Sequence, residues 1–332
     1  MKSTAKVISN LKLRTSYGQT GNQEIPQYRS LAALGSTNYP IGGTITNGIG
    51  SIRIANPDLR WETTSQFDAG IDLSLFSNRI NIVADYYDKR TKNLLLDVQI
   101  PGSSGYQTSL QNVGSVKNTG FEFALNTVNL NGEFKWKTSF NITFNKNEVL
   151  NLGDDYERPA GGGSNSKAIA NTGILRVGEP VGLFYGYVTD GLFQTPAEVT
   201  AGLAAGQAGV QLGDRRYKDI NGDGKLDAND RTILGYAQPD FFYGMTNTFS
   251  YKNFDLNVLI NGVQGNDVLN LNVNAETDIN APGSNNRWTV TNTNTDVPRT
   301  TKETRLTNKQ VEDGSYLRIN CTFYCYHCFF VY

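Results

Sequence analysis

Hydrophobic and polar residues alternate strictly along several long segments, most clearly over residues 134–145. One parity holds Phe134, Trp136, Thr138, Phe140, Ile142 and Phe144, and the residues between them are Lys, Ser, Asn or Thr. Because successive side chains of a β-strand point to opposite faces, the pattern predicts a strand with one apolar and one polar face. Its length of about ten residues is long for a soluble strand and suits a tilted crossing of a bilayer.

The same alternation recurs along the chain, between short polar turns. Residues 66–75 alternate, turn at residues 77–79 and continue at residues 80–86. An Asn-Gly turn at residues 131–132 joins the alternating residues 121–126 to residues 134–145, which predicts a hairpin. Further strands are predicted at residues 11–17, 241–251 and 254–263.

Long polar stretches separate these segments. Loops are predicted for residues 22–58, around 101–105, 153–176 and 264–310, and a short Ala-rich helix is predicted within 195–210. The glycine-rich residues 161–167 lack the Gly-Lys-Ser/Thr ending of a phosphate loop, so they are interpreted as a loop. Short turns that alternate with long loops are typical of outer-membrane β-barrels, and no strand–helix alternation favours an α/β fold.

Composition narrows the function classes. The chain has 332 residues and a formal net charge of -1, so bulk charge favours no nucleic-acid partner. No run of eighteen apolar residues predicts a transmembrane helix, whereas 17 Tyr and 16 Phe suit strands and aromatic girdles. Residues 1–10 contain no signal peptide, so we expect either a cytoplasmic chain or a missing beginning.

All cysteines and the single histidine lie near the carboxyl terminus, at Cys321, Cys325, His327 and Cys328. Thiolate and imidazole groups bind zinc, but their spacing here matches no pair-of-pairs zinc motif. The preferred hypothesis is that residues 320–332 form an aberrant, out-of-frame tail. Sequencing the locus tests this, and an intact reading frame would contradict it.

One motif points to a metal. Residues 219–230 place oxygen ligands at positions one, three, five, nine and twelve, and a backbone carbonyl at position seven. The predicted ligands are Asp219, Asn221, Asp223, Lys225, Asp227 and Asp230, with Gly224 at the sharp turn. This spacing is that of a calcium loop. The residue at position twelve is Asp instead of Glu, and no amphipathic helices flank the loop, so we expect a structural Ca²⁺ that pins a long loop.

Several stretches together resemble the SusC/RagA family of TonB-dependent outer-membrane transporters. They are residues 11–22, 56–64, 177–187, 190–193 and 311–318, together with the acidic loop and its Asp230-Arg231. The resemblance runs from about residue 9 to residue 319, in the family's order. It implies an all-β fold, an antiparallel transmembrane β-barrel of 22 strands with long extracellular loops. This chain would supply a carboxy-terminal part of that barrel over residues 1–319.

The resemblance also implies a function. It predicts the import of oligosaccharides or peptides with a SusD-like lipoprotein, energy from TonB and no enzymatic activity. The family's signal sequence, plug and early strands have no counterpart here, so we expect a segment that neither closes nor transports by itself. Such a segment would expose its apolar stripe and aggregate. In a complete barrel Trp136, Phe140 and Phe144 would face outer-membrane lipid, and lumen-facing residues would contact substrate.

Two alternatives remain open from the residues alone. One is a soluble, secreted β-sandwich that binds carbohydrate and carries a calcium loop. The other is a secreted β-enzyme such as a glycosidase, although adjacent acids such as Asp154 and Asp155 lie in a Gly-rich loop. The apolar face discriminates between them, because a barrel turns it to lipid and a sandwich buries it in a core.

Overall fold

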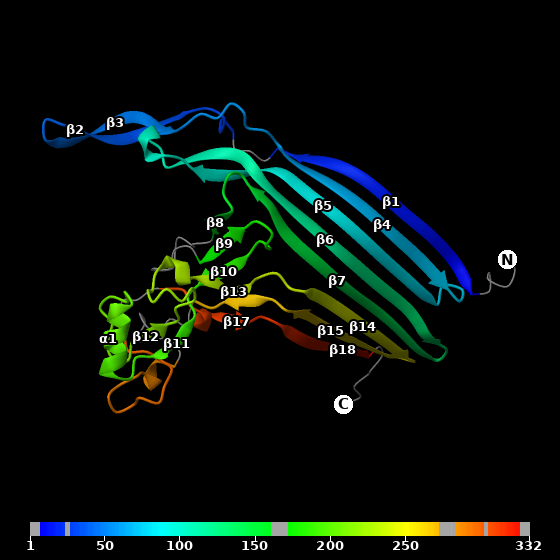
Figure 1. Ribbon diagram of the computed structural model, residues 1–332. Helices are drawn as coiled ribbons and strands as arrows, with labels where there is room; N and C mark the ends of the chain where they lie inside the picture. The colour runs from blue at the N-terminus through cyan, green and yellow to red at the C-terminus, as the bar shows by residue number, and fades with distance from the viewer. Residues whose placement is uncertain are drawn as a thin grey trace, which may run out of the picture. The chain divides into compact units, whose positions relative to one another are not determined.

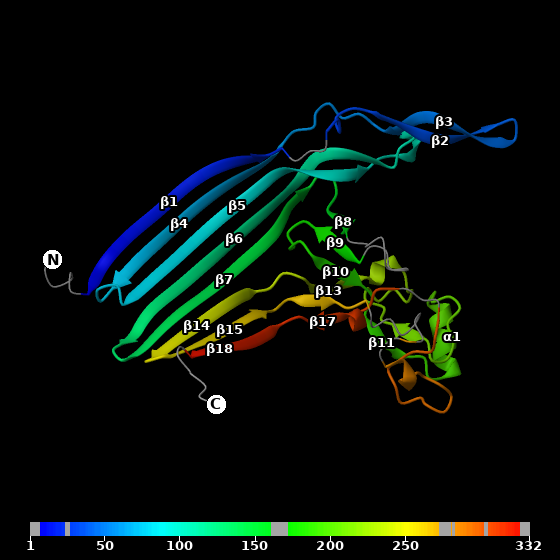
Figure 2. The ribbon, with the colours of Figure 1, turned by 180° about the vertical axis from the view of Figure 1, so that it is seen from behind.

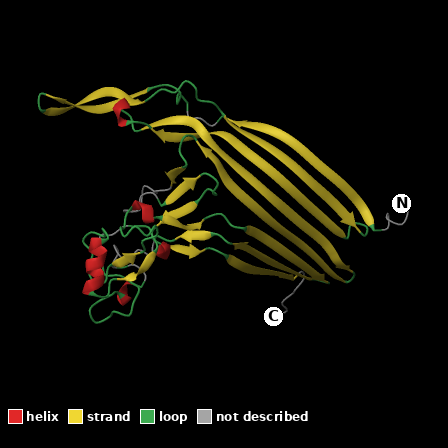
Figure 3. Cartoon of the chain, in the orientation of Figure 1, coloured by secondary structure: helices red, strands yellow, loops and turns green. Residues whose placement is uncertain are grey.

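The computed structural model describes residues 7–23, 27–160, 172–271, 280, 283–301 and 305–325. Strands dominate the fold (Figure 3). The main sheet has the strand order β1-β4-β5-β6-β7-β14-β15-β18. Its strands are β1 (Ile8–Asn22), β4 (Glu62–Leu75), β5 (Ile80–Gln99), β6 (Thr108–Asn131), β7 (Phe134–Leu152), β14 (Phe241–Tyr251), β15 (Phe254–Gln264) and β18 (Tyr316–Cys325). The all-β, antiparallel fold class is confirmed.

The remaining elements are short. A two-stranded sheet pairs β2 (Ala33–Ile41) with β3 (Thr44–Arg53), and a four-stranded sheet joins β8 (Glu157–Ala160), β9 (Gly173–Arg176), β10 (Leu183–Gly186) and β13 (Thr232–Tyr236). Two more pairs are β11 (Thr189–Leu192) with β12 (Arg215–Tyr217), and β16 (Asp267–Leu269) with β17 (Val311–Asp313). The helix α1 covers Pro196–Ala204, and 3₁₀ turns cover Gly102–Ser104, Ala228–Asp230, Ser284–Asn286 and Asn308–Gln310.

The chain divides into two compact units. The first contains Met1–Thr127, Asn145–Tyr156 and Val177–Glu179, and the second contains Val128–Phe144, Glu157–Arg176 and Pro180–Tyr332. In the first unit, β1, β4, β5 and β6 lie side by side in both ribbon views (Figures 1 and 2). In the second unit, β14 pairs with β7 and β15, and β15 pairs with β18.

The predicted strands are present, and most are longer than the sequence pattern indicated. The segment 241–251 is β14 over its full predicted length, whereas the predicted strand 121–126 is the middle of the 24-residue β6. The extra length lies where polar residues occupy both faces. Backbone hydrogen bonds continue the ladder there, but the period-two pattern ends.

The prediction of one loop over residues 22–58 is wrong. Asn22 still belongs to β1, and the β2–β3 hairpin occupies most of the segment. Its turn is Gly42-Gly43, with φ of 60° and 82°, a backbone that glycine adopts without strain. On one face the side chains of Tyr39 and Ile52 lie over glycines, which replaces the apolar alternation that the prediction required.

Two other loop predictions are partly wrong. The segment 153–176 contains β8 and β9, although its glycine-rich part, residues 161–167, lies outside the described residues. The segment 264–310 contains β16 and two 3₁₀ turns. The predicted helix is confirmed as α1, where Thr195 caps the first turn and Glu198 completes the capping box.

The two faces of the sheet differ as the alternation predicted. In the first unit one face carries cross-strand rows such as Leu13–Ile71–Ala84–Phe123, which we call the outer face. The opposite face, called the inner face, is polar. Among the described residues, no helix is both long and apolar enough to span a membrane.

Apolar side chains are buried mainly in residues 181–236 and 265–310, which we call the loop region. The buried set there is Leu183, Leu192, Phe193, Val210, Tyr217, Leu226, Trp288 and Leu306. The Trp288 indole lies against Gly213 and donates from Nε1 to the side chain of Gln194 at 2.9 Å. Arg299 forms an ion pair with the buried Asp214, so this region has a core of its own.

Candidate functional site

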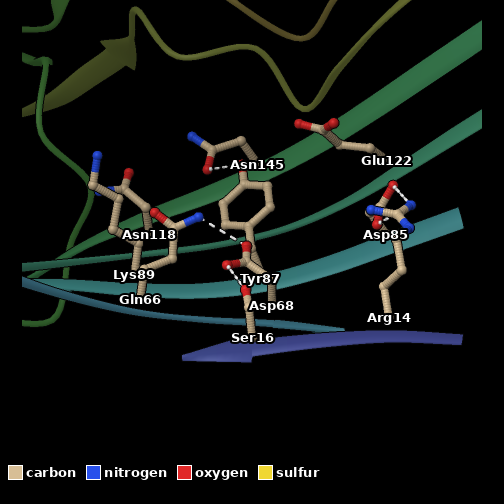
Figure 4. Close-up of a pocket in the computed structure, with 10 residues that line it drawn as sticks. All are labelled: Arg14, Ser16, Gln66, Asp68, Asp85, Tyr87, Lys89, Asn118, Glu122 and Asn145. Carbon is tan, nitrogen blue, oxygen red and sulfur yellow. Dashed lines mark hydrogen bonds and ion pairs between the residues drawn. The ribbon is translucent and has the colours of Figure 1, made fainter. Parts of the chain in front are cut away.

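The inner face of the first unit contains an open polar hollow of about 690 Å³. Its lining comes from five strands: Arg14 and Ser16 on β1, Gln66 and Asp68 on β4, Asp85, Tyr87 and Lys89 on β5, Asn118 and Glu122 on β6, and Asn145 on β7. Figure 4 shows these side chains projecting from neighbouring strands toward the same space. Two cations and three carboxylates therefore face one another in a single hollow.

Strand register explains why the hollow forms here. Three successive inner-face rows cross β1, β4, β5 and β6, and each row includes one glycine. The rows are Arg14–Gly70–Asp85–Glu122, Ser16–Asp68–Tyr87–Gly120 and Gly18–Gln66–Lys89–Asn118. Because a glycine has no side chain, each row leaves space between polar groups. At Gly70 an added Cβ would collide with the Asp85 carboxylate.

Arg14 holds one end of the hollow together. Its Nη2 lies 2.8 Å from Asp72 Oδ1 and 2.9 Å from Asp85 Oδ1, so the guanidinium joins β1 to both β4 and β5. The contact with Asp85 passes over Gly70, where a larger residue would separate the two charges. With side chains 39% and 29% exposed, the pair is screened by solvent and contributes more to geometry than to stability.

The middle of the hollow is a chain of neutral hydrogen bonds. Ser16 Oγ donates to Asp68 at 3.1 Å, Gln66 Nε2 donates to the other oxygen of Asp68 at 2.8 Å, and Tyr87 donates to Asn145 at 2.9 Å. Lys89 and Glu122 form no hydrogen bond or ion pair with other described residues. These two side chains are the charged groups left available to a ligand.

A second hollow of about 510 Å³ lies in the same unit, lined largely by amide side chains. Asn112 donates from Nδ2 to the carbonyls of Arg60 and Asn93 at 2.7 and 2.8 Å, and accepts the Arg60 N–H at 2.8 Å. Asn56 donates to the carbonyl of Leu110 at 2.8 Å. Because these amides already bond to the chain, they fix the 56–62 segment against β6 and are not free for a ligand.

The predicted calcium loop folds as a series of side-chain-supported turns. Asp219 accepts the N–H groups of Gly222 and Gly224 at 2.7 and 2.8 Å, Asn221 accepts that of Asp223 at 3.0 Å, and Asp223 accepts that of Lys225 at 2.8 Å. Gly224 has a φ of 78°, which confirms the sharp turn predicted at position six.

Asp230 closes this loop from within. Its side chain is fully buried and accepts the N–H groups of Ile220 and Asp227, both at 2.9 Å. Burial acts to raise the pKa of the Asp230 carboxyl, but these donated hydrogen bonds outweigh it, so its pKa lies below the usual range. Across the described residues, no three Asp, Glu, Cys or His side chains gather as metal ligands. The loop therefore has the oxygen chemistry of a cation site and a scaffold built from backbone hydrogen bonds.

The cysteine-rich tail divides at residue 325. Cys321 is an exposed free thiol on β18, paired in register with Val258. His327 and Cys328 lie outside the described residues, as does the side chain of Cys325. The hypothesis of an out-of-frame tail over residues 320–332 stays a prediction.

Comparison with known proteins defines the class. A family profile described as "TonB dependent receptor-like, beta-barrel" matches residues 5–275. The TonB-dependent receptor P3 of Formosa agariphila is 37% identical over 95% of this chain and 32% of its own length. The TonB-dependent receptor SusC of Bacteroides thetaiotaomicron is 33% identical over 75% of this chain and 24% of its own length.

Solved structures agree. A structure titled as the RagAB peptide transporter has a TM-score of 0.72 and 26% identity, covering 94% of this chain and 34% of that one. A structure of the RagAB peptide importer in the "open-open" state has the same TM-score, at 95% and 33% coverage.

The chain belongs to the TonB-dependent receptor β-barrel family and is of the SusC/RagA type. It spans about a third of the length of the first curated relatives that it matches. Members of this family are outer-membrane transporters and not enzymes, and the matches give no support to the soluble alternatives.

The sequence pattern named no lumen-facing residue, yet the inner hollow is the richest polar site of the first unit. The signal was present in the rows: glycines at positions 18, 70 and 120 lie beside charged residues on neighbouring strands. It becomes visible only once the register is known. The register of such distant segments cannot be derived from one sequence.

Proposed function

We propose that the protein imports oligosaccharides or peptides across the outer membrane, powered by TonB and assisted by a SusD-like surface lipoprotein. The observation that carries this proposal is the two-faced sheet. Its outer face offers aliphatic and aromatic side chains suited to lipid, and its inner face offers a polar hollow where Lys89 and Glu122 remain available. A transmembrane barrel has this division, with lipid outside and a polar lumen inside.

The names of the relatives support both candidate substrates. RagAB is titled a peptide transporter, and peptides carry charges of both signs that suit a hollow with two cations and three carboxylates. Oligosaccharides suit its amide and hydroxyl groups, from Gln66, Asn118 and Tyr87. Under this proposal Trp136, Phe140 and Phe144 face lipid.

Uptake assays at the native locus test the proposal. We expect deletion of the gene to abolish uptake of a labelled oligosaccharide or peptide, and removal of TonB to have the same effect. The double variant Lys89→Ala/Glu122→Gln should weaken uptake through a higher KM, whereas Asn126→Ala, elsewhere on the inner face, should leave it unchanged. Uptake that persists without the gene would contradict the proposal.

We also propose that residues 219–230 bind a structural Ca²⁺. The oxygen donors Asp219, Asn221, Asp223, Asp227 and Asp230, with the Lys225 carbonyl, suit a hard cation that takes six to eight oxygens. Each carboxylate has about four lone-pair positions, so the backbone hydrogen bonds leave capacity for an ion. Its role would be to hold a long loop in place.

Thermal unfolding with Ca²⁺ and with a chelator tests this second proposal. At a hundredfold excess over Kd, binding should stabilise the folded state by about 2.7 kcal/mol. Asp223→Ala should remove the response, and Asp154→Ala, in another loop, should keep it. An unfolding temperature that ignores Ca²⁺ would contradict the proposal.

A further inference from the structure

The outer face of the first unit ends in a row of cations. Along β5 the outer-face residues run Ile80, Ile82, Ala84, Tyr86, Asp88, Arg90 and Lys92, and the register pairs Arg90 with Lys117 of β6. On β4, Ser65 lies opposite Arg90 and Thr63 lies opposite Lys92. We call Arg90, Lys92 and Lys117 the outer cationic cluster. It faces away from the inner hollow, since the neighbouring Lys89 lies on the opposite face.

Aromatic residues lie directly beneath this cluster. Tyr86 pairs with Phe121 in the row nearer the sheet centre, and Tyr17 pairs with Phe67 in the row between. These side chains are 42% to 73% exposed. A band of aliphatic rows followed by aromatics is how a barrel marks the edge of the hydrocarbon layer.

Length places the cluster at the headgroups. Arg90 lies ten residues beyond Ile80, the first outer-face residue after the turn. At about 3.3 Å per residue and a tilt near 40°, this spans roughly 25 Å, the height of a barrel's apolar band. The end that carries Arg90 is the end joined by the long connections, which in such barrels face outward from the cell.

The charge of the cluster is only partly neutralised. Asp88 lies 3.0 Å from Arg90 and 3.5 Å from Lys117, so one carboxylate serves two cations. Lys92 is exposed, and Arg90 keeps half of its side-chain surface exposed. The corresponding outer-face row of the second unit, Phe144–Phe241–Gln264, carries no charge. The positive patch is therefore a local feature and not a general property of the outer face.

We propose that the outer cationic cluster binds the phosphate groups of an outer-leaflet lipid, whose acyl chains lie along the aliphatic rows below. The inference rests on the proposed outer-membrane function. Arg90 supplies a planar guanidinium that suits a phosphate, and Lys92 and Lys117 supply point charges on flexible stems. Asp88 holds Arg90 and Lys117 close together before the lipid arrives.

Lipid binding to the purified protein tests the proposal separately from transport. The protein would be placed in nanodiscs of neutral phosphatidylcholine, and the affinity for bisphosphorylated lipid A and for its dephosphorylated form would be measured by native mass spectrometry. Each cation near a charged membrane surface contributes roughly a fivefold change in affinity. We expect the triple variant Arg90→Ala/Lys92→Ala/Lys117→Ala to lose about 100-fold for the phosphorylated lipid and nothing for the other.

Matched variants control for misfolding and for general charge. Lys89→Ala, one position along β5 but on the inner face, should bind lipid A within twofold of the parent. Lys117→Arg, which keeps the charge, should do the same, and Arg90→Ala alone should lose about fivefold. If the triple variant does not fold, these single variants still decide the outcome.

Equal lipid A affinity in the parent and the charge-removing variants would overturn the proposal, as would an equal loss in Lys89→Ala. Displacement of the lipid by millimolar inorganic phosphate would overturn it in favour of a free-phosphate site. None of these results depends on uptake. A protein that imports substrate but ignores lipid phosphates would refute the cluster alone, and a protein absent from the outer membrane would refute both.

Discussion

The main sheet and the loop region treat apolar side chains in opposite ways. On the sheet Leu13 and Tyr17 are 75% and 73% exposed, whereas in the loop region Phe193 and Trp288 are 1% and 8% exposed. The sheet is held by long backbone ladders, and the loop region is held by packing around a core, by helix caps and by the Arg299–Asp214 ion pair.

The difference follows from the surroundings that each region requires. A sheet whose apolar residues all lie on one outer face gains nothing by exposing them to water, but loses nothing by exposing them to lipid. The loop region has the inside-out order of a water-soluble domain. One chain therefore follows two sets of rules, and substitutions of the same kind should have different effects in the two regions.

Removing the central ring of the loop region should have the largest effect. Phe193 packs beneath α1, where a Cβ on Gly202 would come within 2.6 Å of the ring. Phe193→Ala leaves a cavity and should cost about 3–5 kcal/mol. Hydrogen exchange of residues 190–215 would report it as lost protection, while Leu203→Ala, at a site 48% exposed, should change little. Equal effects of the two variants would show that the region has no specific core.

A charge on the outer face should have the next largest effect. Phe123 lies in the middle outer row and Ala124 on the inner face beside it. Phe123→Arg should destabilise the membrane-inserted protein by about 2–4 kcal/mol, since it places a cation in hydrocarbon. Ala124→Arg should cost much less, because the lumen is polar. Denaturant unfolding in lipid vesicles measures both, and an equal cost would contradict the assignment of the two faces.

The sequence predicted the sheet better than the loop region, for a physical reason. A strand with lipid on one side must keep its period of two, so Phe134 to Phe144 announced their own face. The predicted hairpin of residues 241–251 and 254–263 was confirmed for the same reason. The β2–β3 hairpin was missed because its pattern is one of glycines covered by Tyr39 and Ile52, and only the Gly42-Gly43 turn could have revealed it.

The candidate sites divide along the same line. The calcium loop is contiguous, so its ligand spacing and the turn at Gly224 could be predicted from neighbouring letters. The inner hollow joins Arg14, Asp85 and Asn145, which only the strand register brings together. The core of the loop region likewise brings Trp288 to Gly213 across a long stretch of sequence. Contacts of this length leave no local pattern.

The glycines of the inner rows offer a smaller effect with an internal control. Gly70→Ala would push the Asp85 carboxylate away from Arg14 and should cost about 1–3 kcal/mol. Gly18→Ala, on the same face with no atom within 4 Å of the new Cβ, should be neutral or stabilise by about 0.4–1 kcal/mol. Denaturant midpoints of the two variants decide this. A costly Gly18→Ala would show that strand flexibility, and not space for Arg14 and Asp85, selects glycine.

The smallest effect should be a pH response confined to α1. Glu198 accepts the N–H groups of Gln194 and Thr195 at 2.7 and 2.9 Å, and these bonds hold the pKa of its carboxyl below the usual range. A carboxyl with a lowered pKa stabilises the fold fully above its unfolded value, near 4.3, and loses that contribution as the pH falls through the folded value. We therefore expect protection factors of the α1 amides to fall in acid below about pH 4.3. Glu198→Gln should lower them at neutral pH and flatten the acid transition, so that the two proteins converge. Asp190→Asn, which alters the other acid beside Arg216, should leave the transition in place. A transition that survives Glu198→Gln would assign the acid sensitivity of this region to another group.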